Sequence, residues 1–337
     1  MSIENLKLPK NYNSDLSILG TQKAIKLVKD TFENKLAKHL HLIRVSAPLF
    51  VSENSGLNDN LNGIERPVHF DIKELNEEYE IVHSLAKWKR MALKKYEFII
   101  GQGLYTDMNA IRRDEDLDNL HSIYVDQWDW EKIITEEQRT INTFKNTVIS
   151  IILALKETES VLVKEFPIIK PFINEHVKFI TTQELEDMYP NNTPKERENL
   201  ICKEFETVCI MQIGDTLKSG KKHDGRAPDY DDWSLNGDIM IYDHILEQAM
   251  EISSMGIRVN KEALLYQLEK SNCMDRLSLP FHSMLVNGEL PLTMGGGIGQ
   301  SRVCMLLLHK AHIGEVQASA WSDEMYKVCR ENNIHLL

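Results

Sequence analysis

The sequence predicts an α+β fold, in which a mostly antiparallel β-sheet is flanked by helices. Three features of the 337 residues support this prediction. Short β-type segments recur along the whole chain, long helical patterns separate some of them, and the regular strand–helix–strand spacing of a parallel sheet is missing. We find no internal repeat and no low-complexity linker in residues 1–337, and this length allows either two domains or a single large one.

The N-terminal region predicts a helix, a strand and a loop. Over residues 24–40, apolar side chains recur at spacings of three and four, as on the buried face of a helix. Residues 42–50 form a β-type run, in which Pro48 favours a strand end or a sheet edge because proline cannot donate to a central ladder. Residues 54–63 are rich in Asn, Asp, Ser and Gly, which predicts a loop.

The middle of the chain predicts three strands and two helices. Residues 80–82 and 98–100 are short apolar runs on either side of a helical pattern over residues 85–93. Residues 123–130 alternate apolar and polar side chains with period two, which predicts a strand with one polar face. An apolar stripe over residues 141–155 predicts a long helix.

The C-terminal region predicts two more strands and a helix that follows a run of glycines. Residues 219–233 are dense in charge, glycine and proline, which predicts a loop, and residues 237–242 predict a strand. Residues 290–294 predict another strand. A glycine-rich turn over residues 295–299 and a helix over residues 301–308 are expected to follow it.

The composition is that of an acidic protein. The chain has 39 Lys and Arg residues and 51 Asp and Glu residues, a net charge of −12, which argues against nucleic acid as a partner because phosphate binding needs clustered basic groups. Five cysteines without a C-x-x-C pair favour a reducing compartment. Residues 1–13 lack the apolar core of a signal peptide, and the apolar run over residues 148–155 is too short for a bilayer. We therefore expect a cytoplasmic protein with no membrane partner.

The glycine run and Arg302 behind it form the first candidate binding element. Glycines let the backbone approach a ligand closely, and the start of the following helix offers free N–H groups and the positive end of its dipole. Arg302 can stack on a base or bind a phosphate group. The alternative is an ordinary glycine turn between a strand and a helix.

A second candidate combines a loop arginine with a polar strand face. Arg112 lies in an Arg-Arg-Asp-Glu-Asp run, where neighbouring carboxylates can orient it toward an α-phosphate. Gln127 and Asp129 are two residues apart in a strand and therefore share one face, and their polarity beside two tryptophans suggests a lined pocket. The alternative is a solvated charge run and a half-exposed strand.

Two further candidates are acidic and basic side chains. Asp238 and Glu251 are carboxylates that neighbouring strands can bring together around a Mg²⁺, which also binds phosphate oxygens. The alternative is that acidic segments are common in a protein of this charge. Lys89 lies in a basic helix start over residues 83–90 and can bind a carboxylate, unless this is only a solvated helix face.

Six segments carry a resemblance to known proteins: residues 83–90, 124–131, 226–233, 235–239, 253–259 and 295–302. In this order they resemble the catalytic core of class II aminoacyl-tRNA synthetases of the aspartyl/asparaginyl type. They resemble still more closely the asparagine synthetase A family of ammonia-dependent aspartate ligases, which uses the same core. Residues 45–50 look like the first synthetase motif, residues 112–116 with 126–131 like the second, and residues 295–302 like the third.

The resemblance implies a homodimer that acts as an ATP-dependent ligase. Aspartate would be activated at its β-carboxylate, giving β-aspartyl-AMP and pyrophosphate, and ammonia would then attack to give L-asparagine and AMP. L-aspartate, ammonia and ATP are the substrates in this scheme, and Mg²⁺ is the cofactor. The chain would form a single catalytic domain without a separate anticodon-binding domain.

The site residues of the family carry over to this sequence one by one. The resemblance implies catalytic roles for Asp59, Lys89, Arg112 and Gln127, substrate binding by Asp129, Asp231, Ser254 and Arg258, nucleotide binding by Arg112, Asp238, Glu251 and Arg302, and metal binding by Asp238 and Glu251. If the Asp-Glu-Asp run is aligned with the synthetases, Arg113 takes the α-phosphate position in place of Arg112.

Two alternative functions stay open from the sequence. An aspartyl- or asparaginyl-tRNA synthetase carries an N-terminal anticodon-binding barrel, but here the first motif begins within fifty residues of Met1 and the net charge is acidic. A catalytically inactive synthetase relative that acts as a binding module is the other alternative. The retained Arg112, Arg302 and acidic pair argue against it.

Overall fold

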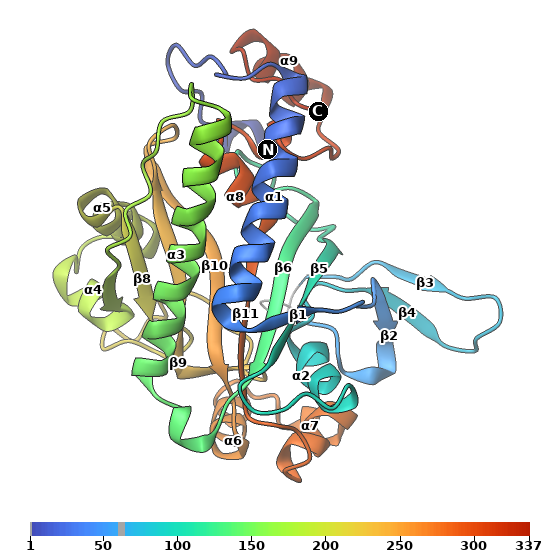
Figure 1. Cartoon of the computed structure of the whole chain (residues 1–337). Coiled ribbons are helices and arrows are strands. Elements are labelled where there is room, and N and C mark those ends of the chain that lie inside the picture. Colours follow the sequence, from blue (N-terminus) through green and yellow to red (C-terminus); the bar gives the residue numbers. More distant parts are fainter. Residues whose placement is uncertain (1, 60–64) are drawn as a thin grey trace.

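A computed structural model describes residues 2–59 and 65–337 of the chain (Figure 1). The larger sheet has eight strands in the order β1-β5-β6-β11-β10-β9-β8-β7. These strands are β1 (Leu42–Arg44), β5 (Gly103–Ile111), β6 (Tyr124–Ile133), β7 (Lys178–Thr181), β8 (Thr207–Met211), β9 (Asp231–Asp243), β10 (Gln248–Arg258) and β11 (Thr293–Gly299). A smaller sheet has the order β2-β4-β3, built from β2 (Phe50–Ser52), β3 (His69–Asp71) and β4 (Glu78–Ile81).

The centre of the larger sheet is antiparallel. Every neighbouring pair from β5 across to β8 is antiparallel, whereas β1 is parallel to β5 at one edge and β7 is parallel to β8 at the other. The helices lie outside the sheet (Figure 1). The predicted α+β class, with a mostly antiparallel sheet flanked by helices, is therefore confirmed.

The α-helices lie on both faces of the larger sheet and at its ends. They are α1 (Ile18–Leu40), α2 (Ala86–Lys95), α3 (Ile141–Glu165), α4 (Thr182–Met188), α5 (Pro194–Phe205), α6 (Lys261–Lys270), α7 (Pro280–Val286), α8 (Gln300–Leu307) and α9 (Asp323–Glu331). Helices α4 and α5 pack on one face of the sheet. The long helices α1 and α3 lie side by side over the other face (Figure 1). Each begins at a hydroxyl cap, because the side chains of Ser17 and Thr140 accept hydrogen bonds from Gly20 N and Thr143 N.

One face of β6 packs into the main hydrophobic core, and its other face carries polar side chains on the opposite side of the sheet. Trp128 and Trp130 are buried in the main hydrophobic core, where the ring of Phe32 from α1 lies 4.7 Å from that of Trp128. Gln127 and Asp129 alternate with these tryptophans and therefore point away from α1 and α3. The tryptophans thus belong to the core. They do not line the pocket that the sequence predicted beside them.

Two elements differ from the sequence-based expectations. Residues 98–100 form no strand in the described structure, because positive φ angles at Glu97 and Gly101 turn the chain on both sides of them. The run over residues 42–50 is split, since β1 ends at Arg44 and Phe50 begins β2 in the other sheet. Pro48 lies in the unpaired stretch between the two strands, which agrees with its expected place at a strand end.

The expected glycine-rich turn is also wrong. Residues 295–299 are part of strand β11, and φ is positive at none of these glycines. The sequence signal failed because glycine is disfavoured in strand interiors and normally marks a turn. Of the expected loop over residues 54–63, residues 60–63 lie outside the described part of the chain.

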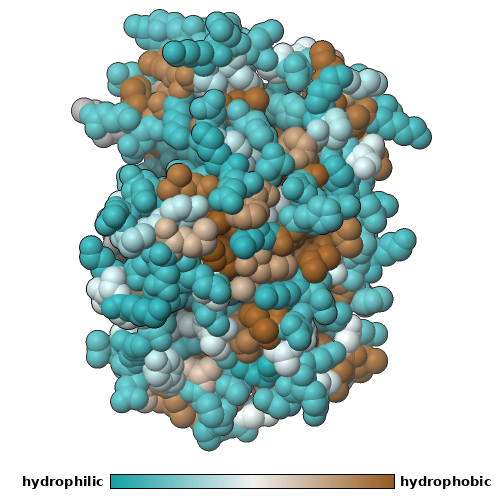
Figure 2. Space-filling view, turned by 90° about the vertical axis from the view of Figure 1, so that its left-hand side faces the viewer, coloured by the Kyte–Doolittle hydropathy of each residue, from teal (hydrophilic) through white to brown (hydrophobic). Residues whose placement is uncertain are grey.

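The surface is mostly polar on the face that Figure 2 shows, with hydrophobic residues gathered near its middle. Exposed apolar side chains on α3 and α5 include Ile149, Leu153 and Leu200. Within the described residues, no helix is both long enough and apolar enough to cross a membrane.

Candidate active site

A cavity of about 710 Å³ lies against the sheet and is lined by residues of β6, β10 and β11. Ten of the eleven residues assigned from the resemblance line this cavity: Asp59, Lys89, Arg112, Gln127, Asp129, Asp231, Glu251, Ser254, Arg258 and Arg302. These residues are spread over some 240 positions of the chain but meet in one place. Asp238 is the exception, because it lies behind Arg226, which does line the cavity.

The glycines of β11 make room for the polar face of β6. Gly295 is paired with Glu131 and Gly297 with Asp129 in the antiparallel register. A Cβ atom on Gly295 would collide with the Glu131 carboxylate, and one on Gly297 would lie 2.7 Å from Asp129 Oδ1. The glycine run therefore serves close packing of polar side chains against the backbone, which requires no positive φ.

Lys89 and Asp129 form a buried ion pair at the wall of the cavity. Lys89 Nζ lies 3.1 Å from Asp129 Oδ2 and donates a hydrogen bond to the carbonyl of Gly296 at 3.0 Å. Burial lowers the pKa of Lys89, although the charge of Asp129 opposes this effect. The pair presents a cation and an anion side by side, as recognition of an amino acid requires.

Arg258 is held by two carboxylates. Its Nη2 lies 2.7 Å from Glu131 Oε2, and its Nη1 lies 2.5 Å from Asp231 Oδ1. Thr293 Oγ1 donates a further hydrogen bond to Glu131 at 2.7 Å. Burial would lower the pKa of Arg258, but the two carboxylates raise it above its usual value. The guanidinium is thus a fixed positive charge whose position is set from two strands.

Asp238 lies in the middle of β9, whereas the sequence predicted that it would lie at the start of a strand. It forms an ion pair with Arg226, a residue of the loop that precedes β9. Burial raises the pKa of Asp238 to about 7, and the negative charges of Glu251 and Asp224 add to this effect while Arg226 opposes it. Carboxylates therefore crowd this wall of the site.

Arg302 and Glu251 also meet there. Arg302 Nη1 donates a hydrogen bond to the carbonyl of Glu251 at 3.0 Å and lies 3.7 Å from Glu251 Oε2. Arg302 lies in the first turn of α8, which begins at Gln300 directly after the last glycine of β11. Ser254 follows on β10 and is paired with both Gly297 and Asp238 in the sheet.

The loop after β5 brings Arg112 and not Arg113 to the cavity. Arg112 is half-buried, and its Nη1 lies 3.8 Å from Glu115 Oε2. Its Nε is a buried donor that makes no hydrogen bond to the described residues. Arg113 is exposed and does not line the cavity. Asp114 from the same run instead binds Arg66, with Nη2 and Oδ1 2.5 Å apart.

Asp59 lines the cavity from the segment between β2 and β3. The Asp59 residue is buried, its backbone N–H donates to Asn58 Oδ1 at 3.0 Å, and its carbonyl lies 3.0 Å from His83 Nδ1. The backbone N–H of His83 donates to the same Asn58 oxygen at 2.8 Å. Asn58 therefore ties the segment carrying Asp59 to the start of the α2 region.

The sequence is similar to known proteins over nearly its whole length. The family model for aspartate-ammonia ligase matches residues 19–333. The chain belongs to the aspartate–ammonia ligase family. Aspartate–ammonia ligases of Clostridium perfringens and Ruminiclostridium cellulolyticum are 61% and 60% identical to it over 336 residues, which are 99% of this chain and 100% of each relative. That of Lactobacillus acidophilus is 59% identical over 334 residues, or 98% of this chain and 99% of the relative.

Solved structures show that this aspartate–ammonia ligase family member shares the class II synthetase fold. The asparaginyl-tRNA synthetase of Pyrococcus horikoshii, complexed with asparaginyl-adenylate, superposes with a TM-score of 0.63 at 12% identity, covering 88% of this chain and 68% of that chain. The asparaginyl-tRNA synthetase of Entamoeba histolytica gives 0.62 at 14% identity, covering 88% and 67%. Both the family and the fold that the six segments predicted are confirmed.

Two residues of this candidate site were missed in the sequence. Glu131 continues the period-two pattern of Gln127 and Asp129, so extending that polar face by one step would have found it. Arg226 begins the segment 226–233 of the resemblance, but no periodicity predicts its pairing with Asp238, because that pairing depends on how a loop folds back onto a strand.

Proposed function

We propose that this member of the aspartate–ammonia ligase family makes L-asparagine from L-aspartate, ammonia and ATP through β-aspartyl-AMP. The aspartate β-carboxylate attacks the α-phosphorus of ATP, and pyrophosphate leaves. Ammonia then attacks the acyl carbon, and AMP leaves with the oxygen that joined the two groups. Family membership at about 60% identity supports this overall reaction.

The buried Lys89–Asp129 pair is the observation that carries the proposal. An amino-acid substrate has an ammonium group that needs an anion and an α-carboxylate that needs a cation. Lys89 and Asp129 supply both charges at one wall of the cavity, 3.1 Å apart and shielded from water. We assign aspartate binding to this pair together with Asp59, Gln127 and the remaining pocket residues Asp231, Ser254 and Arg258.

Arg112 and Arg302 are our candidates for the ATP phosphates and base. Both line the cavity, and neither has a carboxylate closer than 3.7 Å among the described residues. The orphaned Nε of Arg112 is a donor available to a phosphate oxygen, and an arginine aimed at developing charge stabilises adenylation electrostatically. Preorganised positions of these groups supply the rest of the rate acceleration.

Mg²⁺ fits the wall formed by Asp238 and Glu251. The raised pKa of Asp238 reflects burial and the adjacent negative charges, which a divalent cation would relieve. Mg²⁺ is commonly held by one or two carboxylates plus substrate phosphates, which matches this pair. When bound, it would neutralise charge on the phosphates. Arg226 also contributes a positive charge to this wall through its ion pair with Asp238.

We further propose that the chain acts as a single catalytic domain in a cytoplasmic homodimer. Exposed apolar side chains around the first synthetase-like motif support the dimer: Ile43, Leu49 and Phe50, with Ile99 and Ile100 nearby, are 38–64% exposed. The five unpaired cysteines support a reducing compartment. One main core extends from Tyr12 to Ile334, which supports a single domain.

The experiment is pyrophosphate release from ATP and aspartate with the purified chain, supplied in turn with ammonium, glutamine scrubbed of ammonia, and tRNA. Ammonium alone is expected to give asparagine, because glutamine use needs a nucleophilic thiol. Burial raises the pKa of Cys202 and Cys304 to about 12, which leaves them unreactive. Stimulation by tRNA would favour a synthetase, and no release under any condition would favour an inactive relative.

A further inference from the structure

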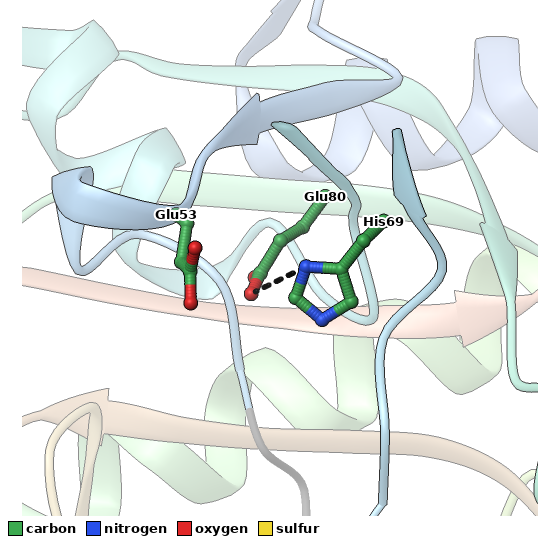
Figure 3. A group of neighbouring side chains, drawn as sticks. All are labelled: Glu53, His69 and Glu80. Atoms are coloured by element: carbon green, nitrogen blue, oxygen red, sulfur yellow. Dashed lines mark ion pairs between the residues drawn. The ribbon is translucent and has the colours of Figure 1, made fainter. Parts of the chain in front are cut away.

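A cluster of potential metal ligands lies on the smaller sheet, away from the cavity. In the part of the chain that the structure describes, Glu53, His69 and Glu80 form the one group of three whose ligand atoms all lie within 4.8 Å of one another. Figure 3 shows the two carboxylates and the imidazole pointing toward one another. The proposed reaction uses none of these side chains.

The backbone brings the three side chains together from three segments. His69 on β3 is paired with Glu80 on β4, so their side chains project from the same face of the sheet. His69 Nδ1 lies 3.8 Å from Glu80 Oε1 (Figure 3). Glu53 begins the short 3₁₀ turn that follows β2, the other neighbour of β4. The cluster therefore joins β3, β4 and the turn that follows β2.

The donor set determines which cation fits. Two carboxylates and one imidazole match the nitrogen and oxygen ligands of Zn²⁺ and similar transition-metal ions, whereas Mg²⁺ and Ca²⁺ take oxygen ligands. We propose that Glu53, His69 and Glu80 bind one divalent transition-metal ion of the Zn²⁺ class, with a coordination position left to water. The His69 side chain is 42% exposed, which gives the ion a path from solvent, whereas that of Glu80 is 11% exposed and held in place.

Glu80 connects this cluster to the segment that carries Asp59. Its Oε2 accepts a hydrogen bond from Asn58 Nδ2 at 2.7 Å, while Oε1 faces His69. Asn58 in turn accepts from the backbone N–H groups of Asp59 and His83. Each oxygen of Glu80 thus has a separate role, and a hydrogen bond such as that from Asn58 orients a metal-binding carboxylate. A bound ion holds β3 and β4 together and braces the Asn58 contact.

The first test is calorimetric titration of the full chain with Zn²⁺. The wild type and the control His335→Ala, which changes an exposed histidine elsewhere, are expected to bind one equivalent with the same Kd. His69→Ala and Glu53→Gln are expected to weaken this binding by more than about tenfold, because each removes a direct ligand. A zinc isotherm for His69→Ala and Glu53→Gln that matches the wild type overturns the proposal.

The second test is limited proteolysis with trypsin at Lys73, an exposed residue between β3 and β4. At a Zn²⁺ concentration about ten times the Kd, the population of opened hairpin falls about tenfold, so cleavage is expected to slow by that factor. His69→Ala in the same buffer corrects for any effect of Zn²⁺ on trypsin. Equal slowing of the wild type and His69→Ala shows that zinc does not bridge the two strands and overturns the proposal.

Discussion

Gly297 lies directly opposite Asp129 in the pair of strands β6 and β11, where a Cβ atom on Gly297 would be only 2.7 Å from Asp129 Oδ1. The same atom would collide with the side chain of Gln127. The two polar side chains therefore occupy the space that any side chain at position 297 would need. This glycine is required by its neighbours and not by its own backbone angles.

Gly297→Ala should displace Asp129 and Gln127 and so weaken aspartate binding. We expect kcat/KM for aspartate to fall by at least about tenfold, with a loss of about 1–3 kcal/mol in stability from overpacking. Steady-state kinetics and thermal unfolding measure the two effects separately. Gly20→Ala in α1, away from the cavity, is the control. An unchanged KM for aspartate in Gly297→Ala would remove these side chains from the substrate site.

Arg112→Ala should abolish most of the adenylation step. Removing a charge-assisted donor aimed at transition-state charge typically costs about 2.7–4 kcal/mol, or about 10²–10³ in kcat. Arg113→Ala is the matched control, because Arg113 is adjacent in sequence but exposed and outside the cavity. Pyrophosphate release and equilibrium binding of aspartate are the measurements. Loss of activity in Arg113→Ala alone would shift the assignment by one residue.

Arg302→Lys should weaken ATP binding with little effect on folding. Lysine keeps the charge but lacks the planar, five-donor guanidinium, so we expect the KM for ATP to rise by about tenfold, the equivalent of one charge-assisted hydrogen bond. Arg330→Lys on the exposed side of α9 controls for a general effect of the exchange. The assignment fails if both variants show the wild-type KM for ATP.

Asp238→Asn and Glu251→Gln should each raise the Mg²⁺ concentration needed for half-maximal activity. Fully charged oxygen ligands hold Mg²⁺ against its own hydration, and an amide oxygen does so less well. Asp275→Asn, an exposed change in a different segment, is the control. Magnesium titrations of the two site variants that overlay the wild type would rule out a role as ligands.

Periodicity predicted the elements whose two faces meet different surroundings. The apolar stripes of α1 and α3 and the alternation in β6 follow from burial on one face only, so each was recognised in the sequence. The short run over residues 98–100 has no such contrast. It is apolar and so predicted a strand, but Ile99 and Ile100 are 63% and 64% exposed and no strand forms there.

The site was harder to predict wherever it depends on tertiary packing. The glycines of β11 indicated a turn, because the need for space beside Asp129 and Glu131 appears only once β6 and β11 are paired. The ion pairs of Arg258 with Glu131 and Asp231 join positions 127 and 27 residues apart. The motif resemblance identified ten residues that line one cavity. Which of these charged groups form ion pairs with one another could be seen only in the folded structure.

The central claim is that the β-carboxylate of aspartate is activated as an acyl adenylate before ammonia attacks. Aspartate labelled with ¹⁸O in its β-carboxylate, incubated with the chain, ATP, Mg²⁺ and ammonium, tests it most directly by mass spectrometry of the products. We expect AMP to carry one ¹⁸O atom for each asparagine formed, because the bridging oxygen leaves with the α-phosphate. Asparagine formed with unlabelled AMP, or with the label in pyrophosphate, would contradict the account.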